Sequence, residues 1–300
     1  MATEEIRQPT YVDRMMDQIS RFRSVYSNLD LSARVSLWII AAIVLIAIFA
    51  DFIAPYDPTA ADYTASVQAP SLAHPMGTDL TGRDILSRMI HGARVSLLVG
   101  VVAVSVAVLA GVTIGSIAGF RGGYVDEALM RVVDVMISFP SLILALAIVG
   151  AVGANLQNII VVIALVYTPQ YARLIRGDVL SVKEEEFVEA ARGTGLSELK
   201  VLRKHVIPNA FTPVFVQATF HVATAIIFEA SLSFLGLGVQ PPTATWGVLI
   251  ADGRQYLPEG WWISTFPGLA IMVTVLAFNI FGDGLRDEID PQSQTIEKGS

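Results

Sequence analysis

Ionisable side chains inside long apolar runs are the first candidates for chemistry in this sequence of 300 residues. A charged group is costly inside a bilayer, and such groups therefore commonly mark a path or a site. His221 and Glu229 both fall in the apolar run 210–235, His221 near its middle. Two interpretations stay open: they line a translocation path, or they satisfy polar groups of a partner chain.

Arg131 and Asp134 form a second candidate at one end of another apolar run. Residues three apart lie on the same face of a helix. We therefore expect an ion pair between these two side chains, with a structural role.

Sequence patterns typical of catalysis are missing. The chain contains no G-x-x-x-x-G-K-[ST], no H-E-x-x-H and no G-x-S-x-G. It has no cysteine, which excludes disulfides, thiolate metal sites and cysteine nucleophiles. We expect no catalytic residue, no metal and no cofactor in this chain; if ATP drives its activity, other chains bind the ATP.

The composition places these candidates in a membrane. Hydrophobic residues make up 53% of the chain and charged residues 16%, and the mean hydropathy is +0.58. A helix needs about 20 apolar residues to cross a bilayer. The sequence predicts an all-α polytopic membrane protein with six transmembrane helices. The six runs are 35–54, 95–119, 128–150, 157–176, 210–235 and 264–282.

The positions of lysine and arginine predict the orientation. With the N-terminus in the cytoplasm, 15 of the 20 basic residues lie inside and 3 outside, and Arg94 and Arg131 lie at helix ends. Cytoplasmic loops are enriched in these residues. Both termini are therefore expected in the cytoplasm.

We divide the chain into four parts. Residues 1–34 form a cytoplasmic N-terminal segment that could contain an amphipathic helix, and 35–92 hold the first transmembrane helix and an extracytoplasmic loop. Residues 93–285 form a core with five transmembrane helices, and 286–300 form a cytoplasmic tail. The longest cytoplasmic segment of the core is 177–209.

The second apolar run carries a small residue at every fourth position. Such a row lets the backbone of another helix approach closely, and this matters in lipid, where packing drives association. We therefore expect a tight helix contact there. The row is Ala103, Ala107, Gly111, Gly115 and Gly119.

Segment 177–209 reads as a hairpin of two short helices. Ser181 and Glu184 fit a capping box for the first helix, and Gly193 and Gly195 end that helix. The second helix begins after the N-cap Ser197. The face of the first helix is formed by Phe187, Ala190, Ala191 and Thr194, and Pro208 is expected to stop the second helix.

The charges of this hairpin suit a protein partner. From Arg173 to Lys204 there are seven basic and six acidic residues. Lipid headgroups or nucleic acid would require a clear positive excess, so no nucleic-acid partner is expected. A solvated connector between two spans is the alternative.

The order Glu189-Ala190-Ala191, Gly195 and Ile207-Pro208 resembles the EAA loop of the permease subunits of ABC importers. The chain departs from this family at His205 and Ile207, where isoleucine and leucine are the more usual residues. The resemblance extends over most of 35–291. It includes "GTDLTGRDILSRMIHGARVSLLVG", "RVVDVMISFPSLILALAIV", "ASLSFLGLGVQPPTATWG" and "FPGLAIMVTVLAFNIFGDGLRDEIDP", which are similar to the C-type permease of dipeptide, oligopeptide and nickel importers.

This resemblance implies a type I ABC importer permease fold in a prokaryotic inner membrane. It implies as partners a second homologous permease, two cytoplasmic ATP-binding subunits and an extracytoplasmic substrate-binding protein. The loop would place a coupling helix, about 186–197, in a cleft of an ATPase. The coupling residues it implies are Glu189, Ala190, Ala191, Gly195, Ile207 and Pro208.

The resemblance also implies cargo. Di- or oligopeptides are expected, and nickel, glutathione or an oligosaccharide are alternatives within the same machinery.

An ion-coupled secondary transporter would use Asp134, His221 and Glu229 as a proton relay, but the sequence shows no internal repeat. An intramembrane enzyme would need a positioned nucleophile or metal cluster, which the sequence lacks. In the outer loop, Trp246, Trp261 and Trp262 fit an interfacial aromatic belt.

Overall fold

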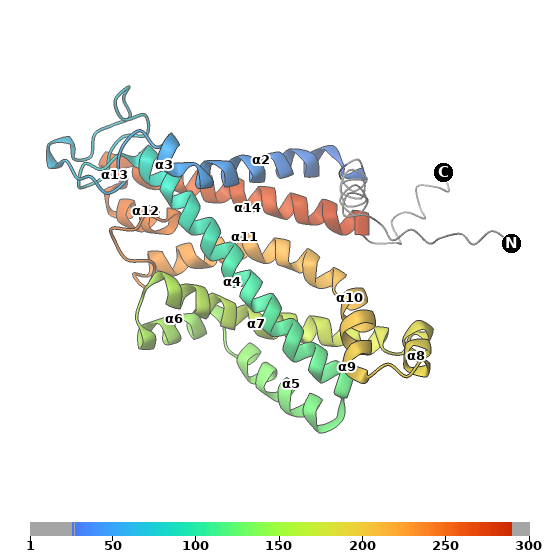
Figure 1. Ribbon diagram of the computed structural model, residues 1–300. Helices are drawn as coiled ribbons and strands as arrows, with labels where there is room; N and C mark the ends of the chain where they lie inside the picture. Colours follow the sequence, from blue (N-terminus) through green and yellow to red (C-terminus); the bar gives the residue numbers. More distant parts are fainter. Residues whose placement is uncertain (1–25, 27, 290–300) are drawn as a thin grey trace.

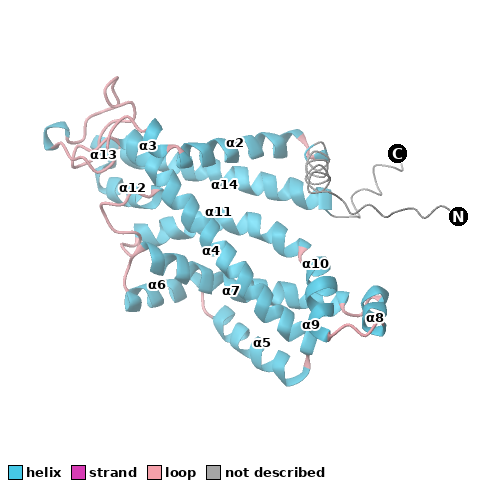
Figure 2. Cartoon of the chain, viewed as in Figure 1, coloured by secondary structure: helices cyan, strands magenta, loops and turns pink. Residues whose placement is uncertain are grey.

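The structure is a computed structural model that describes residues 26 and 28–289. The amphipathic helix expected before residue 35, and the tail beyond 289, lie outside these residues. Within them the chain is helical with no strand, and a single isolated bridge joins Thr78 and Asp84 (Figure 2). The all-α prediction is confirmed.

Five helices are long and apolar enough to cross a membrane. They are α2 (Leu31–Ile48), α4 (Ile85–Arg121), α7 (Leu156–Val182), α11 (Thr212–Phe234) and α14 (Trp262–Ile289). A sixth crossing forms when the bent pair α5 (Gly123–Ser138) and α6 (Ser141–Val152) counts as one span. The prediction of six spans is confirmed on this count.

The continuous helix expected over 128–150 is wrong. The axes of α5 and α6 differ by 92°, and the break lies at Phe139 and Pro140. Phe139 adopts an extended backbone conformation (φ −88°, ψ 138°). A proline disfavours the helical conformation of the residue before it, and here this preference ends α5.

The spans form a slab in which α2 and α14 lie side by side at one edge, with α11 next to α14 (Figure 1). α4 crosses obliquely and packs along α7, and α5 and α6 lie at the opposite edge.

Short elements gather at the two ends. One end, here called the hairpin end, holds α8 (Glu186–Gly193), α9 (Glu198–Val201) and α10 (Ile207–Ala210). The other, the loop end, holds loop 54–84, α3 (Ala50–Ile53), α12 (Trp246–Gly253) and α13 (Leu257–Gly260).

The row of small residues on α4 forms the contact with α7. A Cβ atom added at Gly119 would lie 2.9 Å from the backbone oxygen of Arg176. At Gly115 it would overlap the backbone oxygen of Ala172, and at Gly111 the side chain of Tyr171. The close helix contact predicted from this row is confirmed.

The hairpin differs from its predicted form in two helix boundaries. Ser181 is not a cap, because α7 continues through Val182 and α8 begins only after its N-cap Glu185. Pro208 does not stop the second helix but lies in its last turn, α10. A π-helical segment, Leu202–Val206, comes directly before α10. Proline disrupts an α-helix because it cannot donate the backbone hydrogen bond to the residue four positions before it. The backbone before Pro208 is already π-helical, so Pro208 does not interrupt a regular α-helix there. The side chain of Asn209 donates to the backbone oxygen of His205 at 2.6 Å.

Candidate coupling and translocation site

Helix α8 is held against the body of the protein by one face. Val188 and Ala191, three residues apart, are buried, whereas Glu189 and Ala190 are exposed. Of the apolar face predicted for this helix, Ala191 is buried, whereas Phe187 is 43% exposed and Ala190 and Thr194 are also exposed. Glu189 and Ala190 stand free for a partner.

One residue of α8 contacts the end of α4, and residues on either side of α8 add further contacts. The guanidinium of Arg192 lies over the ring of Phe120, 5.6 Å from its centroid. The ammonium of Lys183, which follows α7, donates to the backbone oxygen of Gly119 at 3.1 Å. Arg192 Nε also lies 3.6 Å from Glu198 Oε1, which links α8 to α9. Arg192 therefore connects α8 with both α4 and α9.

The turn between α8 and α9 depends on Gly195. Its φ is +80°, a conformation that side chains with a Cβ adopt at a cost. Space around it is open, because no atom lies within 4 Å of an added Cβ. Ser197 is the N-cap of α9 as predicted, although its side chain makes no capping hydrogen bond. Ile207 is half-buried and Pro208 exposed at the far end of the hairpin.

The sites predicted inside the spans are partnered within the chain. His221 is buried, and its Nδ1 and the hydroxyl of Tyr171 are 2.9 Å apart. Its ring stacks on Tyr167 with centroids 4.7 Å apart, and its Nε2 lies 2.9 Å from the side-chain nitrogen of Gln217. In this conformation the histidine joins α11 to α7. Its role in a path stays a prediction.

Glu229 is fully buried toward the loop end of α11. Its Oε1 accepts from the hydroxyls of Ser233 at 2.8 Å and Thr245 at 2.9 Å. The Thr245 hydroxyl in turn accepts from the backbone N–H of Val248 and so caps α12. Glu229 Oε2 has no partner among the described residues. The hydrogen bonds of Glu229 and those of His221 go to different residues, and the role of Glu229 in a path also stays a prediction.

The ion pair expected between Arg131 and Asp134 is wrong. Arg131 lies 3.7 Å from Glu127, and Asp134 accepts from Arg173 of α7 at 2.6 Å. A glutamate four residues before an arginine is a favourable arrangement on a helix, and this leaves Asp134 free for another helix. Arg173 could have been selected from the sequence, because it is an ionisable residue inside an apolar run. The sequence does not indicate that its partner is Asp134, 39 positions away.

A buried charge cluster orders the loop end. Arg88, in the first turn of α4, is fully buried and pairs with Asp79 of loop 54–84, and its Nη2 lies 3.7 Å from Asp252 of α12. Burial raises the pKa of Asp79, but the charges of Arg88 and Arg83 outweigh burial and the pKa is lowered. Burial raises the pKa of Asp252, and the charge of Arg88 offsets this only in part.

Two of the three tryptophans expected in an interfacial belt have another role. Trp246 and Trp262 are buried, and their indole N–H groups donate to the backbone oxygens of Met89 and Thr78, each at 3.1 Å. They hold the loop end together. Trp261 is about half exposed and fits the belt.

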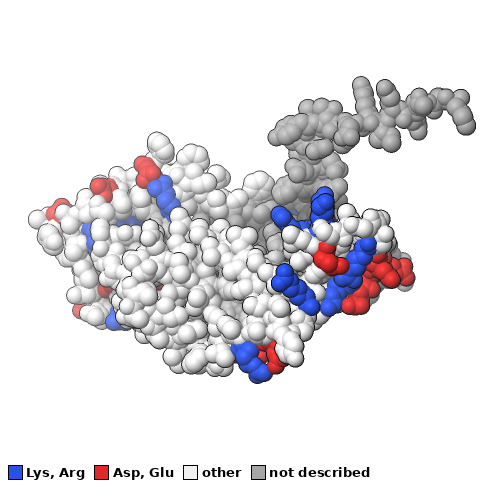
Figure 3. Space-filling model, turned by 60° about the horizontal axis from the view of Figure 1, so that its bottom comes forward, with Lys and Arg blue, Asp and Glu red and all other residues white. Residues whose placement is uncertain are grey.

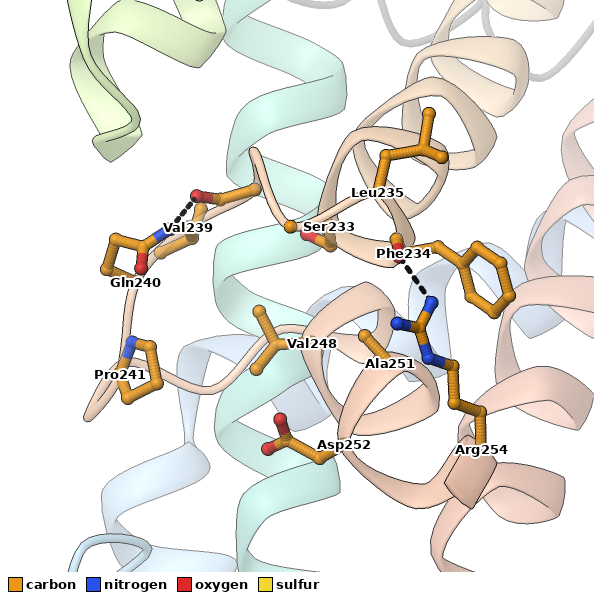
Figure 4. Close-up of a pocket in the computed structure, with 12 residues that line it drawn as sticks. Ser233, Phe234, Leu235, Val239, Gln240, Pro241, Val248, Ala251, Asp252 and Arg254 are labelled. Carbon is orange, nitrogen blue, oxygen red and sulfur yellow. Dashed lines mark hydrogen bonds between the residues drawn. The ribbon is translucent and has the colours of Figure 1, made fainter. Parts of the chain in front are cut away.

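A pocket of about 390 Å³ opens at the loop end between α11 and α12 (Figure 4). Asp252 and Arg254 line one side of it, and the loop with Val239, Gln240 and Pro241 lines the other. Arg254 donates to the backbone oxygen of Phe234 at 2.8 Å and lies over the Phe234 ring. Among the described residues no group of three or more metal-binding side chains occurs.

The fold defines a polytopic membrane protein with a hairpin of short helices at one end. Residues 111–294 match the family described as the inner membrane component of binding-protein-dependent transport systems, and 32–73 match the N-terminal transmembrane domain of oligopeptide transport permease C. The chain belongs to this family of membrane transport permeases.

Curated relatives match over nearly their whole length. A dipeptide transport system permease of Alkalihalophilus pseudofirmus is 42% identical and covers 92% of both chains. A di/tripeptide permease of Pseudomonas aeruginosa is 43% identical over 83% of this chain and 84% of its own. A glutathione transport system permease of Escherichia coli is 43% identical over 83% of both.

The fold is shared with a solved transporter. A chain of the MetNI methionine ABC transporter, in inward-facing conformations, superposes with a TM-score of 0.55 at 20% identity. The match covers 69% of this chain and 97% of that one. The type I importer permease fold implied by the sequence is confirmed.

Proposed function

We propose that this chain is one of two permease subunits of an ATP-driven importer for di- or oligopeptides. Two cytoplasmic ATPases bind the permeases, and an extracytoplasmic binding protein delivers the cargo at the loop end. The hairpin end faces the cytoplasm, and both termini are on the cytoplasmic side of the membrane. The names of the relatives support peptides as cargo, and glutathione, nickel and oligosaccharide remain alternative cargo for the same machinery.

The observation that carries the proposal is the geometry of α8. Arg192 of α8 lies over Phe120 of α4, and Lys183, just before α8, donates to the backbone oxygen of Gly119, whereas Glu189 and Ala190 are exposed. A helix held in this way moves with its partner and passes the displacement on to α4. A flexible connector would absorb the displacement.

Gly195 provides the test of this coupling. In the assembled transporter in vesicles, Gly195→Glu is expected to abolish ATP-driven dipeptide uptake and cargo-stimulated ATP hydrolysis, because bulk and charge enter the surface that meets the ATPase. Gly195→Ala tests strain alone, and a positive φ costs about 1 kcal/mol for alanine. This variant should retain most uptake.

Gly193 is the matched control. It also has open space around it, and its φ is not in the left-handed region, so Gly193→Ala should behave as wild type. Normal uptake by the Gly195→Glu variant, inserted and assembled, would refute the coupling role.

A further inference from the structure

Two ion pairs join α5 to α7, and they differ in exposure. Asp126 and Arg176 form a bidentate pair at 2.5 and 2.6 Å, with side chains 16% and 32% exposed. Asp134 and Arg173 lie 2.6 Å apart with side chains 56% and 54% exposed. The second pair is open to its surroundings on more than half of its surface.

The open pair lies inside the spans. Asp134 is 11 residues beyond the first residue of α5, and Arg173 is 9 residues before the last residue of α7. With a rise of 1.5 Å per residue, both lie about 14 to 16 Å along their helices from the hairpin end. Exposed charges at such a position are expensive in lipid and therefore face a water-filled cavity or the bundle interior.

The neighbouring surface of α7 supports a wet cavity. Gln170 and Gly177 are exposed together with Arg173, at spacings of three and four that place them on one face. The exposed face of α4 is different, since it carries Val102, Val106 and Leu109. An apolar face suits lipid, and a face with a charged pair and an amide does not.

We propose that Asp134 and Arg173 line the translocation path and exchange their mutual contact for the charged ends of a zwitterionic cargo. The cargo ammonium pairs with Asp134 and the cargo carboxylate pairs with Arg173. This inference rests on the proposed function for the chemistry of the cargo. Two ion pairs with the cargo form while the pair within the chain breaks, and this loss offsets part of the gain, so binding stays weak enough for release, as transport requires.

The chain has no cysteine, so accessibility can be measured with single cysteines on the full transporter in vesicles. Asp134→Cys and Arg173→Cys are treated with charged, membrane-impermeant methanethiosulfonates during ATP turnover, with and without dialanine. Leu109→Cys is the control, because Leu109 is 70% exposed on an apolar face. Both test positions should react at least about tenfold faster than the control, because only a thiolate in contact with water reacts.

Three results are expected together. Modification with a reagent of the charge opposite to the native side chain blocks dialanine uptake, dialanine changes the labelling rate, and the two reagents differ in their effect. An anionic reagent should preserve more uptake at position 134, and a cationic one more at position 173. Bulk alone would make both reagents block equally.

The inference is overturned if neither position reacts faster than the control, which would place the pair against lipid or a subunit. It is also overturned if labelling with the reagent of opposite charge to the native side chain leaves uptake unchanged, or if the labelling rate is insensitive to dialanine. A wild-type complex that imports no peptide with ATP would contradict the proposed function, whereas labelling would still report whether the pair faces water.

Discussion

At the scale of single residues, the buried charge of Arg88 is held between two carboxylates. Arg88 has no exposed surface and lies between Asp79 and Asp252, which come from different parts of the sequence. Its Nε and Nη2 make no hydrogen bond with any described residue, so Asp79 is its principal partner. This cluster fixes loop 54–84 to the start of α4.

Asp79→Asn is expected to destabilise the protein by about 3 kcal/mol, because it leaves a buried guanidinium without its closest carboxylate. The measurement is thermal unfolding of the purified protein in detergent. Glu259→Gln, at an exposed position on α13, is the control and should stay close to wild type. Equal stability of the Asp79→Asn variant and wild type would show that Arg88 is adequately solvated without the acid.

The same carboxylate predicts a pH dependence. The pKa of Asp79 is lowered in the folded protein, since the charges of Arg88 and Arg83 outweigh the effect of burial. Its contribution to the free energy of unfolding is complete above the unfolded pKa of about 3.9 and is lost as the pH falls through the folded value. Melting curves of wild type and the Asp79→Asn variant should therefore converge at acidic pH; a difference that stays constant there would contradict the assignment.

At the scale of elements, the close contact of α4 with α7 is the structural centre of the permease. Glycines on α4 let the two backbones approach. At the hairpin end, Phe120 of α4 contacts Arg192 of α8, and Lys183 at the end of α7 donates to the backbone oxygen of Gly119. Rigid packing between α4 and α7 allows a displacement at the hairpin to reach the spans. The broken pair α5 and α6 lies beside this unit and is tied to α7 by its ion pairs.

Gly115→Leu tests this packing. A side chain at Gly115 overlaps the backbone oxygen of Ala172, so the helices must separate, and overpacking of this kind costs about 1 to 3 kcal/mol or more. Gly150→Leu on α6 is the control, because nothing lies within 4 Å of a Cβ there. We expect loss of folded protein in detergent for the first variant only. Similar melting temperatures for both variants would contradict the packing role.

Elements that follow from local periodicity were predictable from the sequence. The spans appear as apolar runs, the α4 contact as a row of small residues, and the hairpin as a charged segment with Gly195 and Ser197 at its turn. The boundaries were less predictable. The break at Pro140 and the π-helical segment before Pro208 depend on how the neighbouring helices pack around each proline. No local sequence pattern predicts this packing.

The candidate site was predictable only in part, because its contacts join distant residues. The polar character of Asp134 and His221 is visible in the sequence, but their partners Arg173 and Tyr171 lie 39 and 50 positions away. The burial of Trp246 and Trp262 depends on backbone oxygens that only the fold brings near. Local spacing favoured Arg131 as the partner of Asp134, and tertiary structure overrides that preference.

At the scale of the whole molecule, the charged side chains on the face shown in Figure 3 gather mainly toward its two ends. Lysine, arginine, aspartate and glutamate gather at the hairpin end and, less densely, at the loop end, and the surface between them is largely uncharged on the face in view (Figure 3). This distribution suits a protein that crosses a bilayer. The hairpin end carries both signs of charge, which suits a protein partner better than a lipid surface.

We propose that this chain moves cargo only when a nucleotide-driven partner acts on its hairpin. The most direct measurement is solute accumulation in vesicles that contain either this chain alone or the complete complex with the second permease, ATPases and binding protein. We expect peptide to accumulate against a gradient only with the complete complex and ATP. Accumulation by the purified chain alone, without nucleotide, would contradict it.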